Sequence, residues 1–303
     1  MKNTTTNTGT HQSVMTQEVI EAFDNAHLKG GRFIDATLGM GGHTLELIKH
    51  GATVLGIEYD QRMLKLAESR IKESQINKGA TYKLIQGNFR DISDIAQKNA
   101  FTEADGILFD LGISNVQLMH PEFGFSFSNP EAKLDMRADS KAQVKAKDLL
   151  NILREDQLRE LFSETLNYPE AKKLSLEVVK RRSLVPFNKV GDLLEVCARV
   201  MPMKGKINPA TKVFLALRIA VNSEMENVRE ALPKAVEVLK EGGILAVITF
   251  HSTEDRIVKD LFTDLEQFRK GEVLTKKPIS AGEDEIMENP KARSAKLRVI
   301  KKI

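Results

Sequence analysis

The feature that most constrains the fold is a short apolar segment that ends in an acid and runs into a glycine-rich turn. Residues 33–43 read F-I-D-A-T-L-G-M-G-G-H, with three glycines within four positions. Glycine suits a backbone that must take positive φ values and let a ligand lie against its amide groups. The segment therefore predicts a parallel strand, a nucleotide-binding turn and the start of a helix. A turn with only a structural role is the alternative.

A second acid lies where a nucleoside-binding sheet needs one. Residues 53–57 read as the next strand, and Glu58 follows it directly. An acid at the tip of the second strand can accept hydrogen bonds from ribose hydroxyls. Nicotinamide-dependent dehydrogenases share this arrangement, so the turn and Glu58 indicate a nucleoside-type cofactor without identifying it.

Strand and helix patterns alternate over the first third of the chain. The expected strands are 32–36, 53–57, 82–86 and 106–110, and the expected helices are 44–49, 61–74 and 92–99. Such alternation predicts an α/β fold with a parallel sheet, right-handed crossovers and a ligand at the carboxyl ends of the strands. A short helix within 11–23 precedes the sheet, and the polar residues 1–10 are expected to form a disordered tail.

The middle of the chain loses its strand pattern. Helices are expected at 146–154, 155–165, 169–182 and 189–200, so residues 141–206 read as a helical insertion between 11–140 and 207–303. Apolar residues then recur at three- and four-residue steps, which predicts a core-facing helix that ends at Gly242–Gly243; they are Phe214, Leu217, Val221, Met225, Val228 and Leu232.

The remaining segments complete the sheet domain. A strand is expected at 244–250, a helix at 257–268, a mobile loop at 271–290 and a last strand at 297–300. The segment Ser252–Asp255 fits a helix-capping pattern. His251 and Arg256, beside it, have fewer structural explanations.

Composition narrows the functional class. The only cysteine, Cys197, lies in a helical apolar stripe, which excludes a disulfide framework and favours burial of its thiol. The six histidines are scattered, so no metal site is predicted. No apolar run approaches the roughly 18 residues that span a bilayer, and the polar start lacks a secretory signal. We therefore expect a cytoplasmic protein without membrane contact.

Basic residues are clustered although the formal net charge is only +3. Residues 290–303 contain six basic and no acidic side chains, and Lys180, Arg181 and Arg182 are consecutive. Either cluster can be a solvated face or a contact for nucleic-acid phosphates.

Residues suited to chemistry follow the fourth expected strand. Asp110 ends that strand in D-L-G-I-S, where it can accept a hydrogen bond from an amine or simply cap the turn. The loop that follows contains Phe123, Phe125 and Phe127. Its aromatic rings can hold an unstacked base or form a hydrophobic plug. Asp135 and Arg137 are either site residues or a mutual ion pair, and Arg218 and Asn222 share a helix face.

In combination, these segments resemble the bacterial 16S ribosomal RNA cytosine-N4 methyltransferases, the small-subunit methyltransferase H family. The resemblance covers nearly the whole chain through nine segments in one order: H-Q-S-V-M, D-A-T-L-G-M-G-G-H, D-L-G-I-S, G-F-S-F, L-D-M-R, N-P-A-T-K, A-L-R-I-A-V-N-S-E, F-H-S-T-E-D-R-I-V-K and N-P-K-A-R-S-A-K-L-R. It implies a Rossmann-like class I methyltransferase sheet that binds S-adenosylmethionine and carries an inserted all-helical domain for RNA recognition.

The resemblance also implies roles for individual residues. Cofactor contacts fall on Gly41, Gly42, His43, Glu58, Phe89, Asp110 and Gln117. Catalytic roles fall on Asp110, Asp135, Arg137 and His251, with Asp110 leading. The substrate would be 16S rRNA of the small ribosomal subunit, modified in the decoding (P-site) region by a monomer or homodimer.

Four positions depart from the family pattern. The family commonly has Asp at Glu58, Ser at Asn115, Arg at Phe123 and Leu at Thr253. The change at Phe123 leaves the details of RNA contact open. A DNA amino-methyltransferase is disfavoured because its tetrapeptide of Asp, Ser or Asn followed by Pro-Pro and Tyr or Phe is missing, and a ribosome-assembly factor without turnover is a further alternative. The exact nucleotide, the acceptor of its proton, and the choice between naked RNA and an assembled subunit stay open.

Overall fold

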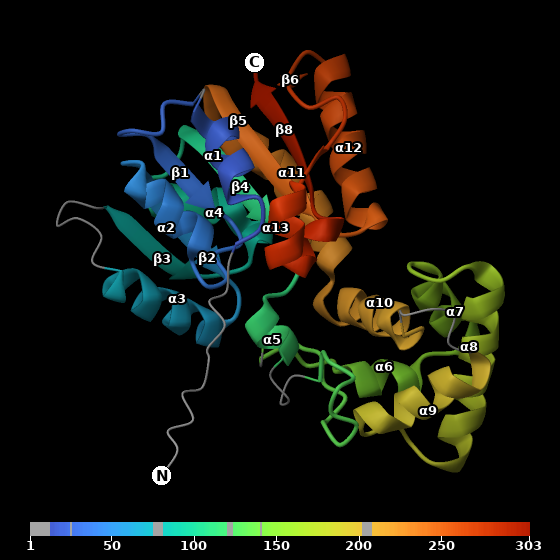
Figure 1. The fold of residues 1–303 in the computed structure, drawn as a ribbon. Helices are drawn as coiled ribbons and strands as arrows, with labels where there is room; N and C mark the ends of the chain where they lie inside the picture. Colours follow the sequence, from blue (N-terminus) through green and yellow to red (C-terminus); the bar gives the residue numbers. More distant parts are fainter. Residues whose placement is uncertain (1–12, 25, 75–80, 120–123, 140, 202–207) are drawn as a thin grey trace, which may run out of the picture. The chain divides into compact units, whose positions relative to one another are not determined.

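The structure is a computed structural model that describes residues 13–24, 26–74, 81–119, 124–139, 141–201 and 208–303 (Figure 1). It divides into two compact units. The described residues up to Gly112 together with Glu230–Ile303 form the sheet unit, and Ile113–Arg229 form the helical unit. The helical unit therefore extends beyond the expected insertion, 141–206, on both sides. The predicted tail, 1–10, lies outside the described residues.

The sheet unit is built on one eight-stranded sheet in the order β3-β2-β1-β4-β5-β8-β6, with β7 paired to β8. Strands β1 to β4 run parallel, as predicted, β5 is also parallel to β4, and β8 is antiparallel to β5, β6 and β7. The strands are β1 (Arg32–Asp35), β2 (Thr53–Glu58), β3 (Tyr82–Gln86), β4 (Ala104–Asp110), β5 (Leu239–Thr249), β6 (Gly271–Val273), β7 (Ile279–Ser280) and β8 (Lys296–Lys302).

Helices with one apolar face connect these strands. In α3, for example, Met63, Ala67 and Ile71 recur at four-residue steps and are buried, and Asp60 caps the helix by accepting the N–H of Arg62. The helical segments of this unit are α1 (Thr16–Asp24), α2 (Gly42–Lys49), α3 (Gln61–Glu73), η1 (Phe89–Asp91), α4 (Ile92–Lys98), α12 (Ser252–Gln267), α13 (Glu283–Glu288) and η3 (Pro290–Ser294). A further helix, α11 (Glu224–Val238), crosses the boundary between the units.

Three sequence-based expectations are corrected here. The long helix is two helices, α10 (Ala210–Asn222) and α11, because Ser223 takes the left-handed conformation with φ 48°. Gly242 and Gly243 do not end a helix but lie in a bulge of β5, where the pairing jumps from Ala104–Leu239 to Gly106–Ile244. The expected mobile loop, 271–290, contains β6, β7 and α13, since two of its segments pair with β8.

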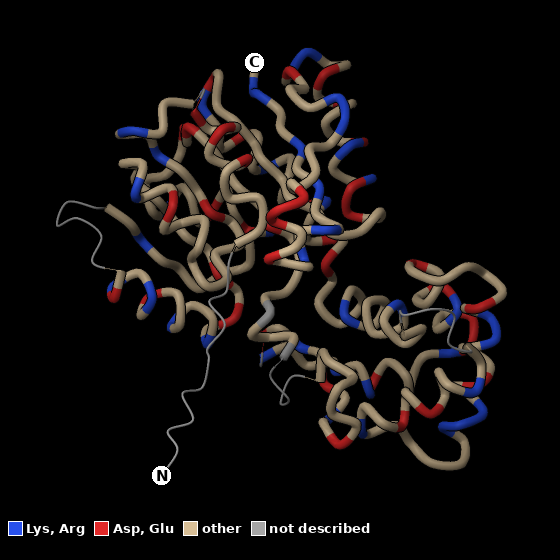
Figure 2. Tube along the Cα trace, in the orientation of Figure 1, with Lys and Arg blue, Asp and Glu red and all other residues tan. Residues whose placement is uncertain are grey.

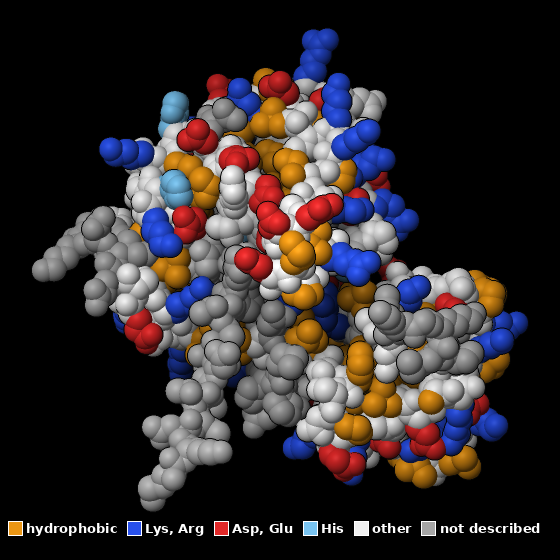
Figure 3. All heavy atoms as spheres, in the orientation of Figure 1, with side chains coloured by type: hydrophobic (Ala, Val, Ile, Leu, Met, Phe, Trp, Pro, Cys, Tyr) orange, Lys and Arg blue, Asp and Glu red, His pale blue; other side chains and the backbone are white. Residues whose placement is uncertain are grey.

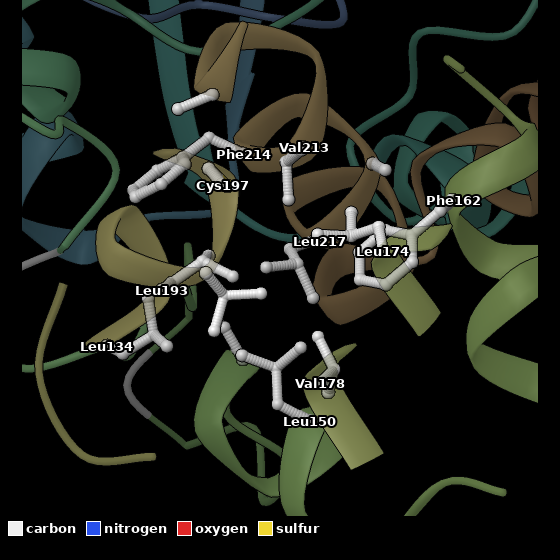
Figure 4. Packing of buried hydrophobic residues seen from close by; sticks show 14 of the residues in the cluster. Leu134, Leu150, Phe162, Leu174, Val178, Leu193, Cys197, Val213, Phe214 and Leu217 are labelled. Atoms are coloured by element: carbon white, nitrogen blue, oxygen red, sulfur yellow. The ribbon is translucent and has the colours of Figure 1, made fainter. Parts of the chain in front are cut away.

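The helical unit has its own apolar core (Figure 4). Its four predicted helices are confirmed as α6 (Ala146–Ile152), α7 (Glu155–Ser163), α8 (Tyr168–Leu184) and α9 (Val190–Val200). Along the chain, α5 (Asn115–Met119) precedes them and α10 follows them. Buried side chains from these helices pack together, among them Leu150, Phe162, Leu174, Val178, Leu193 and Leu217. Cys197 belongs to this core, and burial raises the pKa of its thiol to about 12. The thiol is therefore a core group and not a nucleophile.

A candidate cofactor site at the carboxyl edge of the sheet

Three acids meet at one edge of the sheet unit. Asp35, Glu58 and Asp110 end β1, β2 and β4. These strands are parallel and adjacent, with Asp35 in register with Gly56 of β2 and Leu108 of β4. The carboxyl ends of neighbouring parallel strands form the usual ligand crevice of an open α/β sheet. The edge therefore presents three carboxylates around the loop that follows β1.

That loop has the geometry that its glycines predict. Gly39 and Gly41 take φ values of 53° and 73°, and Gly41 precedes α2. A Cβ on Gly42 would lie 1.9 Å from the Oγ of Ser13, so the chain before α1 approaches the turn closely. No side chain among the described residues caps α2 at Gly41. The first amide groups of α2 are thus available to a polar ligand.

Glu58 is tied to the same turn. Its carboxylate accepts the N–H of Gly39 and the N–H of Asp60, each at 2.8 Å. Burial raises the pKa of Glu58 to about 7, although these two hydrogen bonds act in the opposite direction. Because each carboxylate oxygen has a second lone pair, the group can still accept hydrogen bonds from ligand hydroxyls.

A buried imidazole contacts one of these acids, and a second acid is fully buried beside the same turn. Nε2 of His43 lies 3.5 Å from Oδ2 of Asp110, and the His43 side chain is only 5% exposed. Asp35 is fully buried and accepts hydrogen bonds from the Thr44 hydroxyl at 2.7 Å and the Thr37 amide at 3.3 Å. Burial also raises the pKa of Asp35.

The pKa of His43 is raised as well. Burial by itself would lower it, but the neighbouring carboxylates of Asp110, Asp35 and Glu285 outweigh that effect. Neither ring nitrogen of His43, nor Oδ1 of Asp110, has a hydrogen-bond partner among the described residues. Buried polar atoms without partners are costly, so this pair marks a place where a ligand or a proton is expected.

An aromatic side chain follows β3 at the same edge. Phe89 is half-buried and makes an edge-to-face contact with the buried Phe109 of β4, with ring centroids 5.6 Å apart. A ring fixed in this way offers a planar apolar surface to a purine. Its predicted contact with adenine stays a prediction.

His251 has a structural role at the start of α12. The capping pattern in the sequence predicted this start at Ser252, one residue later. The N-cap of α12 is His251, not Ser252, and its imidazole accepts the N–H of Glu254. Glu254 in turn accepts the amide hydrogens of Phe250 and His251. The side chain nevertheless stays at the end of β5, whose residue Ile248 is in register with Asp110.

In the helical unit, Asp135 and Arg137 form the mutual ion pair that the sequence left open. The guanidinium donates to the carboxylate at 2.6 and 2.9 Å, which holds the pKa of Asp135 below its usual value despite partial burial. Gln117 is also buried in this unit, where its side chain accepts the N–H of Ser114. Its predicted contact with the cofactor stays a prediction.

The structure favours a hydrophobic plug over a base-binding surface for the aromatic loop. Phe125 is buried in the core of the helical unit, and Phe127 packs edge-to-face on Phe214 at 5.6 Å. The Phe125 ring could not receive a base without leaving its apolar neighbours, whereas Phe127 is only partly buried. Phe123 lies outside the described residues.

Several basic residues expected to meet RNA are used inside the protein. Arg298 is 6% exposed and pairs with Asp255. Arg181 pairs with Asp192, and Arg182 donates hydrogen bonds to the carbonyl groups of Leu150 and Leu153. By contrast, Lys180 and Arg293 are exposed.

Sequence reasoning missed two groups of this edge. Thr37 accepts the amide hydrogen of Asp110 at 2.6 Å and so links the glycine turn to β4. The sequence identified Asp35 only as the end of an apolar run. Nothing in it predicted the hydrogen bond from Thr44, except that both residues flank the turn. No group of three or more His, Cys, Asp or Glu side chains in the described ranges could hold a metal ion. None of the helices in those ranges combines the length and hydropathy that crossing a bilayer requires.

Comparison with known families matches residues 8–303 to the MraW methylase family. The chain is 42% identical over 296 residues to a protein named ribosomal RNA small subunit methyltransferase H from Coprothermobacter proteolyticus, with 96% of each chain covered. It is 38% identical over 298 residues to the protein of that name from Persephonella marina, covering 97% of this chain and 99% of the relative. Among solved structures, an rRNA methylase from Streptococcus thermophilus aligns over 96% of this chain and 99% of its own, with 11% identity and a TM-score of 0.45.

Proposed function

The chain belongs to the MraW methylase family, and from this premise we propose that it methylates N4 of a cytosine in 16S rRNA, in the decoding (P-site) region. At the coarser level, it is an S-adenosylmethionine-dependent methyltransferase that acts on small-subunit ribosomal RNA. The observation that carries the proposal is the family match over 8–303 in a chain whose glycine turn, Glu58 and Asp110 share one sheet edge.

The residues at this edge suit S-adenosylmethionine. Glu58 would accept the ribose hydroxyls, Phe89 would lie beside the adenine, and Gly41 and Gly42 would let the donor approach the backbone. The unpartnered oxygen of Asp110 suits a cationic or amine-bearing group. When bound, the donor supplies a methyl group on a positively charged sulfur, a strong electrophile. The protein's own residues then have to present the nucleophile.

Cytosine N4 is a weak nucleophile because its lone pair is delocalised into the ring. Asp110 would accept one N4 hydrogen, which localises that pair and fixes its direction of approach. Alignment of this kind can contribute roughly 7 kcal/mol or more to lowering the barrier. Gly112, with φ 108°, leaves room next to Asp110 for the base. The target must also leave its stack, at a cost of a few kcal/mol.

The remaining predicted residues receive supporting roles in this proposal. The Asp135–Arg137 pair would hold the loop after the aromatic segment, and His251 would line the end of β5. The helical unit would bind the surrounding RNA. The enzyme would work in the cytoplasm on the small subunit, as a monomer or homodimer.

Replacement of Asp110 tests the reaction. We expect Asp110→Asn to abolish methyl transfer while changing donor affinity by less than about tenfold, since Asn retains the size of the side chain. Asp91→Asn, an exposed acid of the sheet unit, is the matched control. Liquid chromatography coupled to mass spectrometry of nucleosides from small-subunit RNA, with and without the enzyme, identifies the product, because retention time separates isomers of equal mass. Appearance of 5-methylcytidine in place of N4-methylcytidine would reject the proposed position, and full activity of Asp110→Asn would reject the proposed residue.

A further inference from the structure

The His43–Asp110 pair has a property that ligand binding by itself does not require. His43 is buried in the first turn of α2, whereas Asp110 is 24% exposed at the sheet edge. Both ring nitrogens of His43 lack hydrogen-bond partners among the described residues. A proton that reaches the imidazole from the site would therefore pass through Asp110, which lies 3.5 Å away.

The charges around His43 favour a proton there. The elements around α2 carry Asp35 on β1, Glu58 on β2, Asp110 on β4, Arg70 on α3, Glu18 and Glu21 on α1 and Glu285 on α13, and α2 itself carries Glu46. Figure 2 shows that α13 is mostly acidic, and acidic side chains gather over it on the face drawn in Figure 3. The same elements also carry basic groups, namely Lys49 and His50 on α2, Arg32 on β1 and Arg62, Lys65, Arg70 and Lys72 on α3. Lys49, Arg62 and Lys72 pair with carboxylates, and Arg70 donates to the carbonyl of Met40. The charges that act on His43 itself are those of Asp110, Asp35 and Glu285, so its immediate surroundings are negative and stabilise one additional positive charge.

Methyl transfer moves one positive charge within the site. The donor arrives with a positively charged sulfur, and the product keeps a neutral one. The C–S bond breaks with its electron pair left on sulfur, the N4 lone pair forms the C–N bond, and the methylated amine must lose one proton. A negative pocket would then favour keeping that proton close by.

We propose that His43 takes this proton through Asp110, so that the charge of the site is the same before and after methyl transfer. This inference rests on the proposed methyl transfer. Asp110 accepts the N4 proton and passes it to Nε2 of His43, and the imidazolium releases it to water when the products leave. His43 acts through Asp110 and is therefore a positioning residue. The sulfonium and the proton on His43 occupy the same negative environment in turn.

A direct test is the ionisation of His43 itself. We would follow its imidazole ring carbon by NMR from pH 5 to 9 in the wild-type protein, with S-adenosylmethionine or S-adenosylhomocysteine bound. We expect the midpoint with the positively charged donor to lie below that with the neutral product by about one pH unit, the effect of one nearby like charge. Equal midpoints in the two complexes would overturn the proposal. Failure of either compound to bind would instead reject the proposed function.

Affinity provides a second readout. The contribution of Glu58 to the pH dependence cancels in the ratio of the dissociation constants of donor and product, because both compounds carry the ribose. We expect calorimetry to show that donor binding improves relative to product by about fivefold or more as pH rises from 6 to 8.5, since His43 loses its proton. His43→Gln should abolish this change, and His50→Gln, an exposed histidine at the end of the same helix, should keep it. A pH-independent ratio in the wild type, or an unchanged slope in His43→Gln, would contradict the inference.

The single-turnover rate completes the test. With donor and RNA saturating, the wild-type rate should rise with pH and then level off, while His43→Gln should be slower by at least about tenfold with a flatter profile. A His43→Gln enzyme with the wild-type rate and profile would exclude the proposed role. If this variant does not fold, the NMR titration of the wild type still decides between the outcomes.

Discussion

Arg298 donates two hydrogen bonds to the Asp255 carboxylate, from Nε at 2.7 Å and from Nη2 at 3.2 Å. Arg298 lies on β8 and Asp255 in the first turn of α12. The pair therefore joins the segment N-P-K-A-R-S-A-K-L-R to the segment F-H-S-T-E-D-R-I-V-K, two of the segments that resemble the family. Lys296 contributes a further contact to Asp255 at 3.4 Å. These motif residues stabilise the sheet unit and are not free for RNA.

Loss of this pair should destabilise the protein. Arg298→Ala leaves the partly buried Asp255 with Lys296 as its remaining partner, and we expect the free energy of unfolding to fall by about 2 kcal/mol, in the range for loss of hydrogen bonds to a charged group. Arg293→Ala, which removes an exposed cation of the same segment, should change it by less than about 0.5 kcal/mol. Urea unfolding followed by circular dichroism measures both. Equal effects of the two substitutions would show that the pair contributes no stability.

The same pair predicts an acid-sensitive stability. Arg298 and Lys296 hold the pKa of Asp255 below its usual value, although partial burial acts in the opposite direction. Its contribution to stability is therefore present above the unfolded pKa of about 3.9 and is lost as pH falls through the lower folded pKa. The wild type should lose stability faster than Asp255→Asn between pH 4 and 2. Parallel unfolding curves for the two proteins would contradict this.

Glu58 should make ligand binding depend on pH. Its pKa of about 7 in the free protein means that it must lose a proton to accept ribose hydroxyls. The affinity for S-adenosylhomocysteine should therefore rise from pH 5 to 7 and then level off, with proton release during binding. Calorimetry in buffers of different ionisation enthalpy measures both quantities. Glu58→Gln should bind more weakly and without this dependence, and Glu73→Gln, an exposed acid at the end of α3, should behave as the wild type.

In the absence of ligand, Glu58 should make the stability of the folded protein fall as pH rises. Its folded pKa of about 7 lies above the ordinary value of 4.5, so the folded protein holds this proton more tightly. The stabilising contribution is present below pH 4.5 and is lost as pH rises to 7. The stability of Glu58→Gln relative to the wild type should therefore increase over this range. A constant difference between the two proteins would argue against the raised pKa.

Asn222 should be needed for the shape of the L-D-M-R turn. Its amide donates to the carbonyl of Met136 at 2.9 Å and accepts the N–H of Ala138 at 2.8 Å. Met136 itself is buried and left-handed, with φ 62°, a conformation that is strained for its side chain. We expect Asn222→Ala to lower the free energy of unfolding by about 2 kcal/mol because two partly buried groups lose their partner. Asn188→Ala, an exposed asparagine of the same unit, is the control for chemical denaturation.

Exposed and internal cations should respond differently to substitution. Lys180→Ala and Arg293→Ala should each reduce the dependence of RNA affinity on salt by about one unit of slope, with unchanged stability. Arg182→Ala should mainly destabilise the helical unit, because its guanidinium satisfies two carbonyl groups. Filter binding at several salt concentrations, together with thermal unfolding, separates the two classes. RNA affinity that does not change with salt would remove the electrostatic role of these residues.

Local patterns were sufficient for much of the sheet unit. The apolar run before Asp35, the glycines of the turn and the four-residue repeat in α3 each depend on the backbone or on near neighbours, so the sequence shows them directly. The parallel strands β1 to β4, the existence of a strand at β5 and the helices of the middle segment followed from the same kind of information. The break at Ser223 did not, because nothing in the apolar repeat from Phe214 to Leu232 marks a left-handed residue.

The sequence by itself determined which residues could carry chemistry: Asp110, Glu58, the glycine turn and the basic clusters. Only the tertiary structure decided which of these groups are already engaged. Arg298 reaches Asp255 from 43 positions away, and His43 meets Asp110 from a different element. Whether a charged side chain is available for a ligand depends on its neighbours in space and on the loss of water around it. Neither quantity is encoded in the spacing of residues along the chain.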